Sequence, residues 1–134
     1  MAQLEESQTI TQRRQEIFTR YPDSLHPLAE KGLLSLPRWP DYCEHNAHLF
    51  YLILEDEEIR DALQSHLREP GIHAVFHYVP LHTSKMGESF GYQRGDLPVT
   101  ESISGRLLRL PFYLELERTS RERVIAEIKT FFGH

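Results

Sequence analysis

The stretch AHLFYLILEDEEIRDALQSHLREPGIHAVFHYV, residues 47–79, decides the fold expected of this chain. Residues 47–55 are rich in aromatic and branched side chains, which favour a buried strand that ends at an acidic turn. A helical pattern follows the turn, and residues 72–79 again read as a strand. The sequence therefore predicts a strand, a helix and a strand in succession.

The helix in the middle of this stretch has clear signals at both ends. Asp56 can cap its first turn, and the acidic residues around it suit the positive end of the helix dipole better than they suit an acid/base pair. Pro70 and Gly71 end the helix. Its apolar residues recur at four-residue spacing and form one stripe that faces the core: Ile59, Leu63 and Leu67.

The residues before this stretch predict two helices and a loop. Residues 4–20 favour a mainly exposed helix whose apolar residues are Leu4, Ile10, Ile17 and Phe18. A short second helix over 24–31 ends at Gly32, which can adopt the left-handed conformation common after helices. Two prolines then make residues 36–46 an extended loop, since each removes a backbone donor and disfavours helix in the residue before it.

After the stretch, the pattern predicts a long polar loop and two more helices. Residues 80–98 contain three glycines and no steady period, and long loops in compact domains are usually functional or mobile. A short helix begins at Thr100, and an extended piece follows it. Thr119 and Glu122 suggest a capping box for the last helix, whose apolar face contains Val124, Ile125, Ile128 and Phe131.

This order of elements predicts an α+β fold, in which a small, mainly antiparallel sheet is covered by helices. The 134 residues suit a single domain, and 40% hydrophobic content is that of a globular protein. A net charge of -5 argues against a nucleic-acid or anionic-membrane surface. The lone Cys43 cannot form an internal disulfide, and the first residues lack a signal-peptide pattern, so we expect a cytoplasmic protein.

The segment GIHAVFHYVPLHTSK, residues 71–85, contains most of the candidate chemistry. Strand alternation would place His73 and His77 on one face. A metal site would recruit His77 and His82 with Cys43, His45 and His48, although the spacing matches no compact zinc pattern. Cys43 with a histidine could form a nucleophile and base. The simplest interpretation is a set of hydrogen-bonded histidines at a strand end.

Four segments in fixed order resemble the DegT/StrS nucleotide-sugar aminotransferase family. They are NAHLFYLIL (46–54), GIHAVFHYVPLH (71–82), GESFGY (87–92) and SGRLLRLPFY (104–113). The resemblance covers nearly the whole chain and corresponds to the C-terminal part of the family. It implies the small domain of a fold-type-I enzyme that uses pyridoxal phosphate and transfers an amino group from glutamate to a nucleotide-linked 4-keto sugar.

The resemblance also implies a division of the chain and of the chemistry. Residues 1–134 would be one domain, with a linking helix over 4–20 and the small domain over 33–134, and the large domain that holds the cofactor on a lysine would be absent. Such a lysine must be sheltered beside a phosphate cradle. The chain's three lysines, Lys31, Lys85 and Lys129, lack that context. We therefore expect no covalently bound cofactor and no activity from this chain alone.

By the same resemblance, the candidate substrate-binding residues are His77, Tyr78 and His82, with Pro80 shaping the turn between them. The loop over 84–98 would be a flap that faces the nucleotide sugar. An alternative function is a stand-alone module that forms a homodimer or binds a partner through the surface that the large domain would cover. A third, weaker alternative is a metal-dependent enzyme that uses His77, His82 and Cys43.

Overall fold

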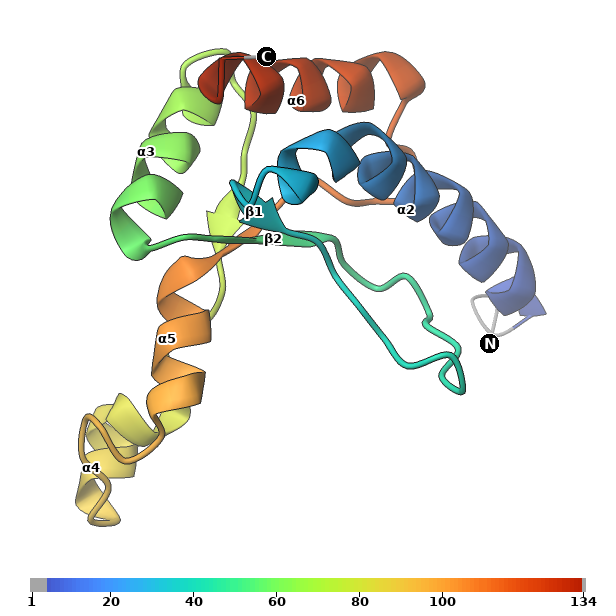
Figure 1. Ribbon diagram of the computed structural model, residues 1–134. Helices are drawn as coiled ribbons and strands as arrows, with labels where there is room; N and C mark the ends of the chain where they lie inside the picture. The colour runs from blue at the N-terminus through green and yellow to red at the C-terminus, as the bar shows by residue number, and fades with distance from the viewer. Residues whose placement is uncertain (1–4, 134) are drawn as a thin grey trace.

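The computed structural model describes residues 5–133, so the predicted role of Leu4 and the last residue of the predicted domain lie outside the described residues (Figure 1). The elements, in chain order, are α2 (Ser7–Glu30), β1 (Leu34–Ser35), β2 (Tyr51–Leu54), α3 (Glu57–Arg68), β3 (Val75–Phe76), η1 (Leu81–Thr83), α4 (Lys85–Ser89), α5 (Pro98–Arg106), β4 (Leu107–Arg109) and α6 (Arg118–Phe131). None of the helices within residues 5–133 is both long and apolar enough to cross a bilayer.

The four strands form one antiparallel sheet in the order β1-β2-β4-β3, which confirms the predicted α+β class. Leu52 of β2 lies opposite Leu108 of β4, and both side chains are fully buried. Helices α2, α3 and α6 pack together with the sheet and enclose the core. We call the sheet with these three helices the body.

Helix α2 differs from the two helices predicted for this part of the chain. It runs without a break from Ser7 to Glu30, through Pro22 and Pro27. Each proline removes one donor to the carbonyl four residues earlier, but the helix buries five large side chains, whose burial offsets those losses: Ile17, Phe18, Tyr21, Leu25 and Leu28. The predicted break into two helices is thus wrong, whereas the described residues of the predicted helix over 4–20 are mainly exposed, and Gly32 does adopt a positive φ of 74°.

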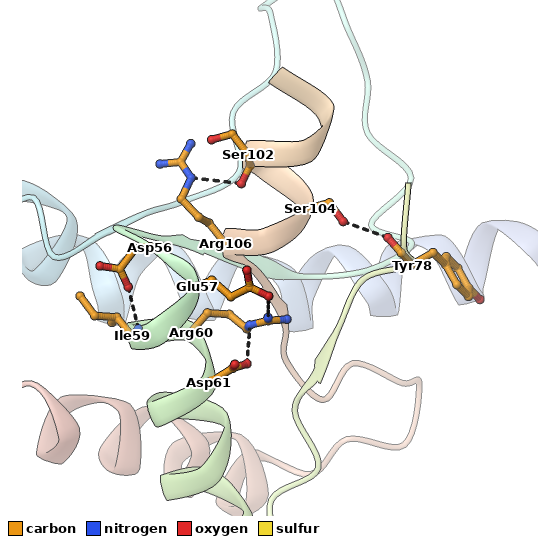
Figure 2. Close-up of polar contacts among 9 residues, drawn as sticks. All are labelled: Asp56, Glu57, Ile59, Arg60, Asp61, Tyr78, Ser102, Ser104 and Arg106. Atoms are coloured by element: carbon orange, nitrogen blue, oxygen red, sulfur yellow. Dashed lines mark hydrogen bonds and ion pairs between the residues drawn. The ribbon is translucent and has the colours of Figure 1, made fainter. Parts of the chain in front are cut away.

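Helix α3 follows its prediction closely. The Asp56 side chain accepts a hydrogen bond of 2.7 Å from the backbone N–H of Ile59, which is the expected cap (Figure 2). Leu63 and Leu67 are fully buried, and Ile59 packs against the edge of the core. The sequence pattern therefore fixed both the start of this helix and the face that it buries.

Helix α6 confirms the predicted apolar face but not the predicted capping box. The helix begins at Arg118, so Thr119 lies inside the first turn and cannot cap it. Glu122 instead binds the Nε of Arg118 at 2.6 Å, one turn earlier on the helix surface. Ion pairing between side chains four residues apart has replaced the pairing of Glu122 with a capping threonine.

The structure differs from the prediction in two neighbouring segments, the predicted strand over 72–79 and the predicted loop over 80–98. Only Val75 and Phe76 pair in the sheet. The segment after Pro80 contains η1 and α4, and α5 begins at Pro98 rather than Thr100. We call residues 77–106 the arm; Figure 1 shows α4 and α5 projecting away from the body. Local hydrogen bonds in turns, which apolar periodicity does not encode, build this segment.

Candidate functional site

The segment 78–82 lies against one side of α5 and is tied to it by two side chains. The Ser104 hydroxyl donates a 3.0 Å hydrogen bond to the carbonyl oxygen of Tyr78 (Figure 2). One turn earlier on the helix, Glu101 accepts a 2.8 Å hydrogen bond from the Nε2 of His82. Because residues three apart share a helix face, both contacts come from the same side of α5.

Glu101 makes a second contact with the same oxygen atom. The backbone N–H of Gly95, in the return from α4 to α5, donates to Glu101 Oε1 at 2.7 Å. The bonds from His82 and from Gly95 both stabilise the ionised carboxylate, so they lower the pKa of Glu101. A single carboxylate oxygen on α5 thus holds both η1 and the return from α4 to α5.

The turn that follows His82 is closely packed. The Thr83 hydroxyl donates to the carbonyl oxygen of Pro80 at 3.0 Å, and the Ser84 side chain accepts from the backbone N–H of Gly87 at 3.1 Å. A Cβ atom on Gly87 would overlap the carbonyl oxygens of Leu81 and His82. Only glycine therefore lets α4 approach η1 this closely.

The three predicted site residues have different surroundings. Tyr78 is 76% exposed, and its ring is turned away from α5 (Figure 2). His77 is half-buried, with its ring centroid 5.1 Å from that of Tyr78, and its buried Nδ1 atom has no hydrogen-bond partner. His82 is only 6% exposed and is held by Glu101. The structure brings His77 and Tyr78 together at the surface and turns His82 inward.

A polar cleft of about 370 Å³ opens between α3, the segment around Phe76 to Thr83, and α5. At its floor, the buried Arg60 guanidinium donates a 2.9 Å hydrogen bond to Glu57 and pairs at 2.9 Å with Asp61 (Figure 2). The same guanidinium lies 5.7 Å from the centre of the exposed Phe76 ring. Both carboxylates pair with Arg60, so its guanidinium is not free to bind a phosphate.

A second hollow, an apolar groove of about 450 Å³, lies along the same segment. Its walls come from residues 77–81 and from the side of α5 that carries Val99 and Ile103. His77 lines both the polar cleft and this groove. The segment 77–82 is thus a partition with a polar side and an apolar side.

The alternatives based on metals and on Cys43 gain no geometric support. Within residues 5–133, no group of three or more histidine, cysteine or acidic side chains is arranged to hold a metal ion. Cys43 is exposed, and the His45 ring packs against Trp39 in a tilted arrangement with ring centroids 4.1 Å apart. His82, another member of the predicted metal set, forms its hydrogen bond with Glu101.

Sequence reasoning missed the two residues that hold the segment, Glu101 and Ser104. A signal was present, since both follow Pro98 within a helical stretch and lie three positions apart. The sequence pattern could not identify the partners of these two residues, because Ser104 lies 26 positions from Tyr78 and Glu101 lies 19 positions from His82. Arg60 was overlooked for another reason: it lies between apolar positions of a helix and looks like an ordinary surface charge.

Comparison with known proteins links this arrangement to one family. Residues 1–129 match the model of the DegT/DnrJ/EryC1/StrS aminotransferase family. The chain is 36% identical over 97 residues to the erythromycin biosynthesis sensory transduction protein EryC1 of Saccharopolyspora erythraea, covering 72% of this chain and 26% of that protein. It is 32% identical over 108 residues to a pleiotropic regulatory protein of Geobacillus stearothermophilus, covering 80% and 29%.

A solved structure extends the likeness to the fold. DesV of S. venezuelae, crystallised with a ketimine intermediate, superposes with a TM-score of 0.86 at 30% identity over 99% of this chain and 34% of its own. The chain therefore spans about a quarter to a third of the length of the proteins that it matches.

Proposed function

Because the chain belongs to the DegT/DnrJ/EryC1/StrS aminotransferase family, we propose that it is the C-terminal small domain of an aminotransferase that uses pyridoxal phosphate. The reaction would transfer an amino group from glutamate to a nucleotide-linked 4-keto-6-deoxy sugar. The match to DesV over 99% of this chain but 34% of that one supports this role more than any other observation. The exposed thiol of Cys43 supports a cytoplasmic location.

The residues of this chain do not fit a covalently held cofactor. Pyridoxal phosphate supplies an electron sink when a sheltered lysine of the enzyme holds it. Here Lys31 and Lys85 are exposed, and Lys129 is half-buried on the last helix. The proposed part of this chain is therefore recognition: it would form a wall beside the sugar nucleotide and leave the covalent chemistry to the remaining part of the enzyme.

We assign the recognition to the segment 77–82. The Tyr78 phenol is exposed beside the His77 ring, and its hydroxyl can donate to a phosphate oxygen or exchange a hydrogen bond with a sugar hydroxyl. His82, buried on Glu101, supports the segment from behind. The four quoted motifs further suggest the branch that makes dTDP-4-amino-4,6-dideoxygalactose as the specific relative.

Nuclear magnetic resonance of the labelled chain tests this assignment. Addition of dTDP-glucose, a stable nucleotide sugar, should shift amide signals of residues 77–82 and leave those of α6 in place. Tyr78→Phe removes only the hydroxyl and should weaken the effect, whereas Tyr113→Phe, at another exposed tyrosine, serves as the matched control. Shifts confined to other parts of the chain would contradict the assignment.

A second experiment tests the absence of covalent chemistry. The purified chain is mixed with pyridoxal phosphate, reduced with borohydride and digested, and the modified lysines are identified by mass spectrometry. Exposed amines should be labelled weakly and without preference. Stoichiometric labelling of one lysine, with a matching aldimine absorption band, would show that this chain holds the cofactor itself.

One observation favours the alternative of a self-associating module. Of the thirteen large hydrophobic side chains that are exposed among residues 5–133, ten lie within residues 75–99, which concentrates them on β3 and the arm. Such a surface favours either a large domain or a second copy as its partner. Light scattering on the isolated chain distinguishes the two partners. A chain that is monomeric at all concentrations would exclude the homodimer.

A further inference from the structure

We propose that Glu101 is a positioning residue, whose carboxylate holds His82 and the Gly95 turn together and thereby fixes the segment 77–82 in the shape that meets the ligand. The ligand in this statement rests on the proposed function, whereas the clamp itself rests on geometry alone. Neither the family likeness nor the sequence pattern assigns this role to Glu101.

The spacing of the two anchors on α5 determines the shape of the segment. Ser104 and Glu101 lie three residues apart, which is about 4.5 Å along a helix axis. Tyr78 and His82 lie four residues apart, which would be about 13 Å in an extended strand. The chain between them must therefore bend, and it does so at Pro80, where the η1 turn begins.

That bend exposes the side chains between the anchors. Val79 is 62% exposed and Leu81 is 86% exposed, although both are apolar. With Tyr78 they form the outer edge of the partition between the polar cleft and the apolar groove. Release of one anchor would let the segment straighten, and Tyr78 would leave the position beside His77.

No other part of the arm can take over this role. Among residues 5–133, all twenty buried hydrophobic residues lie outside 75–107, so the arm has no apolar core of its own. His82, in contrast, is buried, and loss of its carboxylate partner would leave a polar ring shielded from water without a hydrogen bond. The order of the arm thus depends on a few polar contacts, of which Glu101 makes two.

Hydrogen exchange measures the clamp without any ligand. In Glu101→Ala, amides of residues 80–97 should exchange about tenfold faster than in the parent chain, because one side chain supplies both contacts. Glu101→Gln retains an oxygen acceptor and should give an intermediate rate. Glu115→Ala, which removes an exposed carboxylate outside the arm, is the matched control and should change nothing.

The imidazole signals of His82 provide a readout that a general loss of structure would not imitate. In the parent chain the Nε2 proton is shared with a carboxylate, so its signal should be shifted strongly downfield. That shift should disappear in Glu101→Ala while the amide signals of α3 and α6 stay in place. An unchanged His82 signal, or unchanged exchange of the arm, would overturn the clamp.

Binding of dTDP-glucose then separates the two proposals. If the parent chain binds at residues 77–82 and Glu101→Ala binds severalfold more weakly, the positioning role is supported. If both bind equally well, Glu101 does not position the segment for the ligand. If the parent chain does not bind there but the arm still opens in Glu101→Ala, the proposed function fails for the isolated chain and the clamp stands.

Discussion

The body and the arm of this protein are stabilised by different forces. The body buries leucine and other large apolar side chains between three helices and a sheet, whereas the arm leaves most of its own exposed and relies on hydrogen bonds from Glu101, Ser104 and Ser84. Apolar burial is shared among many side chains, so a single substitution on the surface of the body has little effect on its stability. The polar contacts of the arm depend on a few side chains, so one substitution can break them. We expect the two regions to unfold separately.

The largest effect should come from removal of a core side chain. Leu63→Ala leaves a cavity between α3 and the sheet and should lower the free energy of unfolding by about 2–5 kcal/mol. Leu81→Ala makes the same chemical change at an 86% exposed site and should stay within about 0.5 kcal/mol. Urea unfolding followed by circular dichroism measures both. Equal losses would show that the arm belongs to the core.

A smaller and more local effect is expected at the tightest contact in the arm. Gly87→Ala places a methyl group against two carbonyl oxygens, and such overpacking usually destabilises by about 1–3 kcal/mol. The arm should relieve the clash by opening, so exchange should rise over 81–95 while the urea midpoint of the body hardly moves.

Gly105→Ala is the control for the glycine substitution. A Cβ atom there would meet its nearest neighbour, Glu57 Oε2, at an ordinary 3.5 Å, and the residue lies inside α5. Alanine should therefore be tolerated and should stabilise the helix by up to about 1 kcal/mol. If both glycine variants behaved alike, the close approach of α4 to η1 would not be what holds the arm.

Loss of a single helix cap should have a moderate effect on the body alone. Asp56→Ala removes the hydrogen bond to the Ile59 amide and should destabilise α3, and with it the body, by about 1 kcal/mol. Asp41→Ala, in the exposed loop before β2, controls for the loss of a carboxylate. The urea midpoint should fall for the first variant only, and arm exchange should be equal in both.

The smallest effect is a dependence on pH that is confined to the arm. The contacts of Glu101 with His82 and with Gly95 lower its pKa, so its stabilisation is complete above the ordinary carboxyl pKa and is lost as the pH falls through the lowered value. The amide proton of Gly95 should shift upfield as the pH falls below the ordinary carboxyl range and the lowered pKa of Glu101 is passed. Glu101→Gln should abolish this titration, and a shift that persists in that variant would have another origin.

The sequence by itself determined the elements whose signals are local. The apolar stripe of α3, its Asp56 cap, the buried strand before it and the apolar face of α6 all follow from periodicity and from contacts within one turn. The family motifs also lie in the sequence, and they placed His77, Tyr78 and His82 among the candidate residues. These features require no knowledge of distant partners.

The tertiary structure alone decided what depends on contacts between distant residues. Helix α2 continues past Pro22 and Pro27 because its buried side chains stabilise it. Only two residues of the predicted strand over 72–79 pair in the sheet. The tertiary packing also places Glu101 beside His82. His82 is therefore buried, whereas Tyr78 is exposed. Local patterns report which face a residue prefers, but a hydrogen bond between residues far apart in the chain exists only after the packing has brought them together.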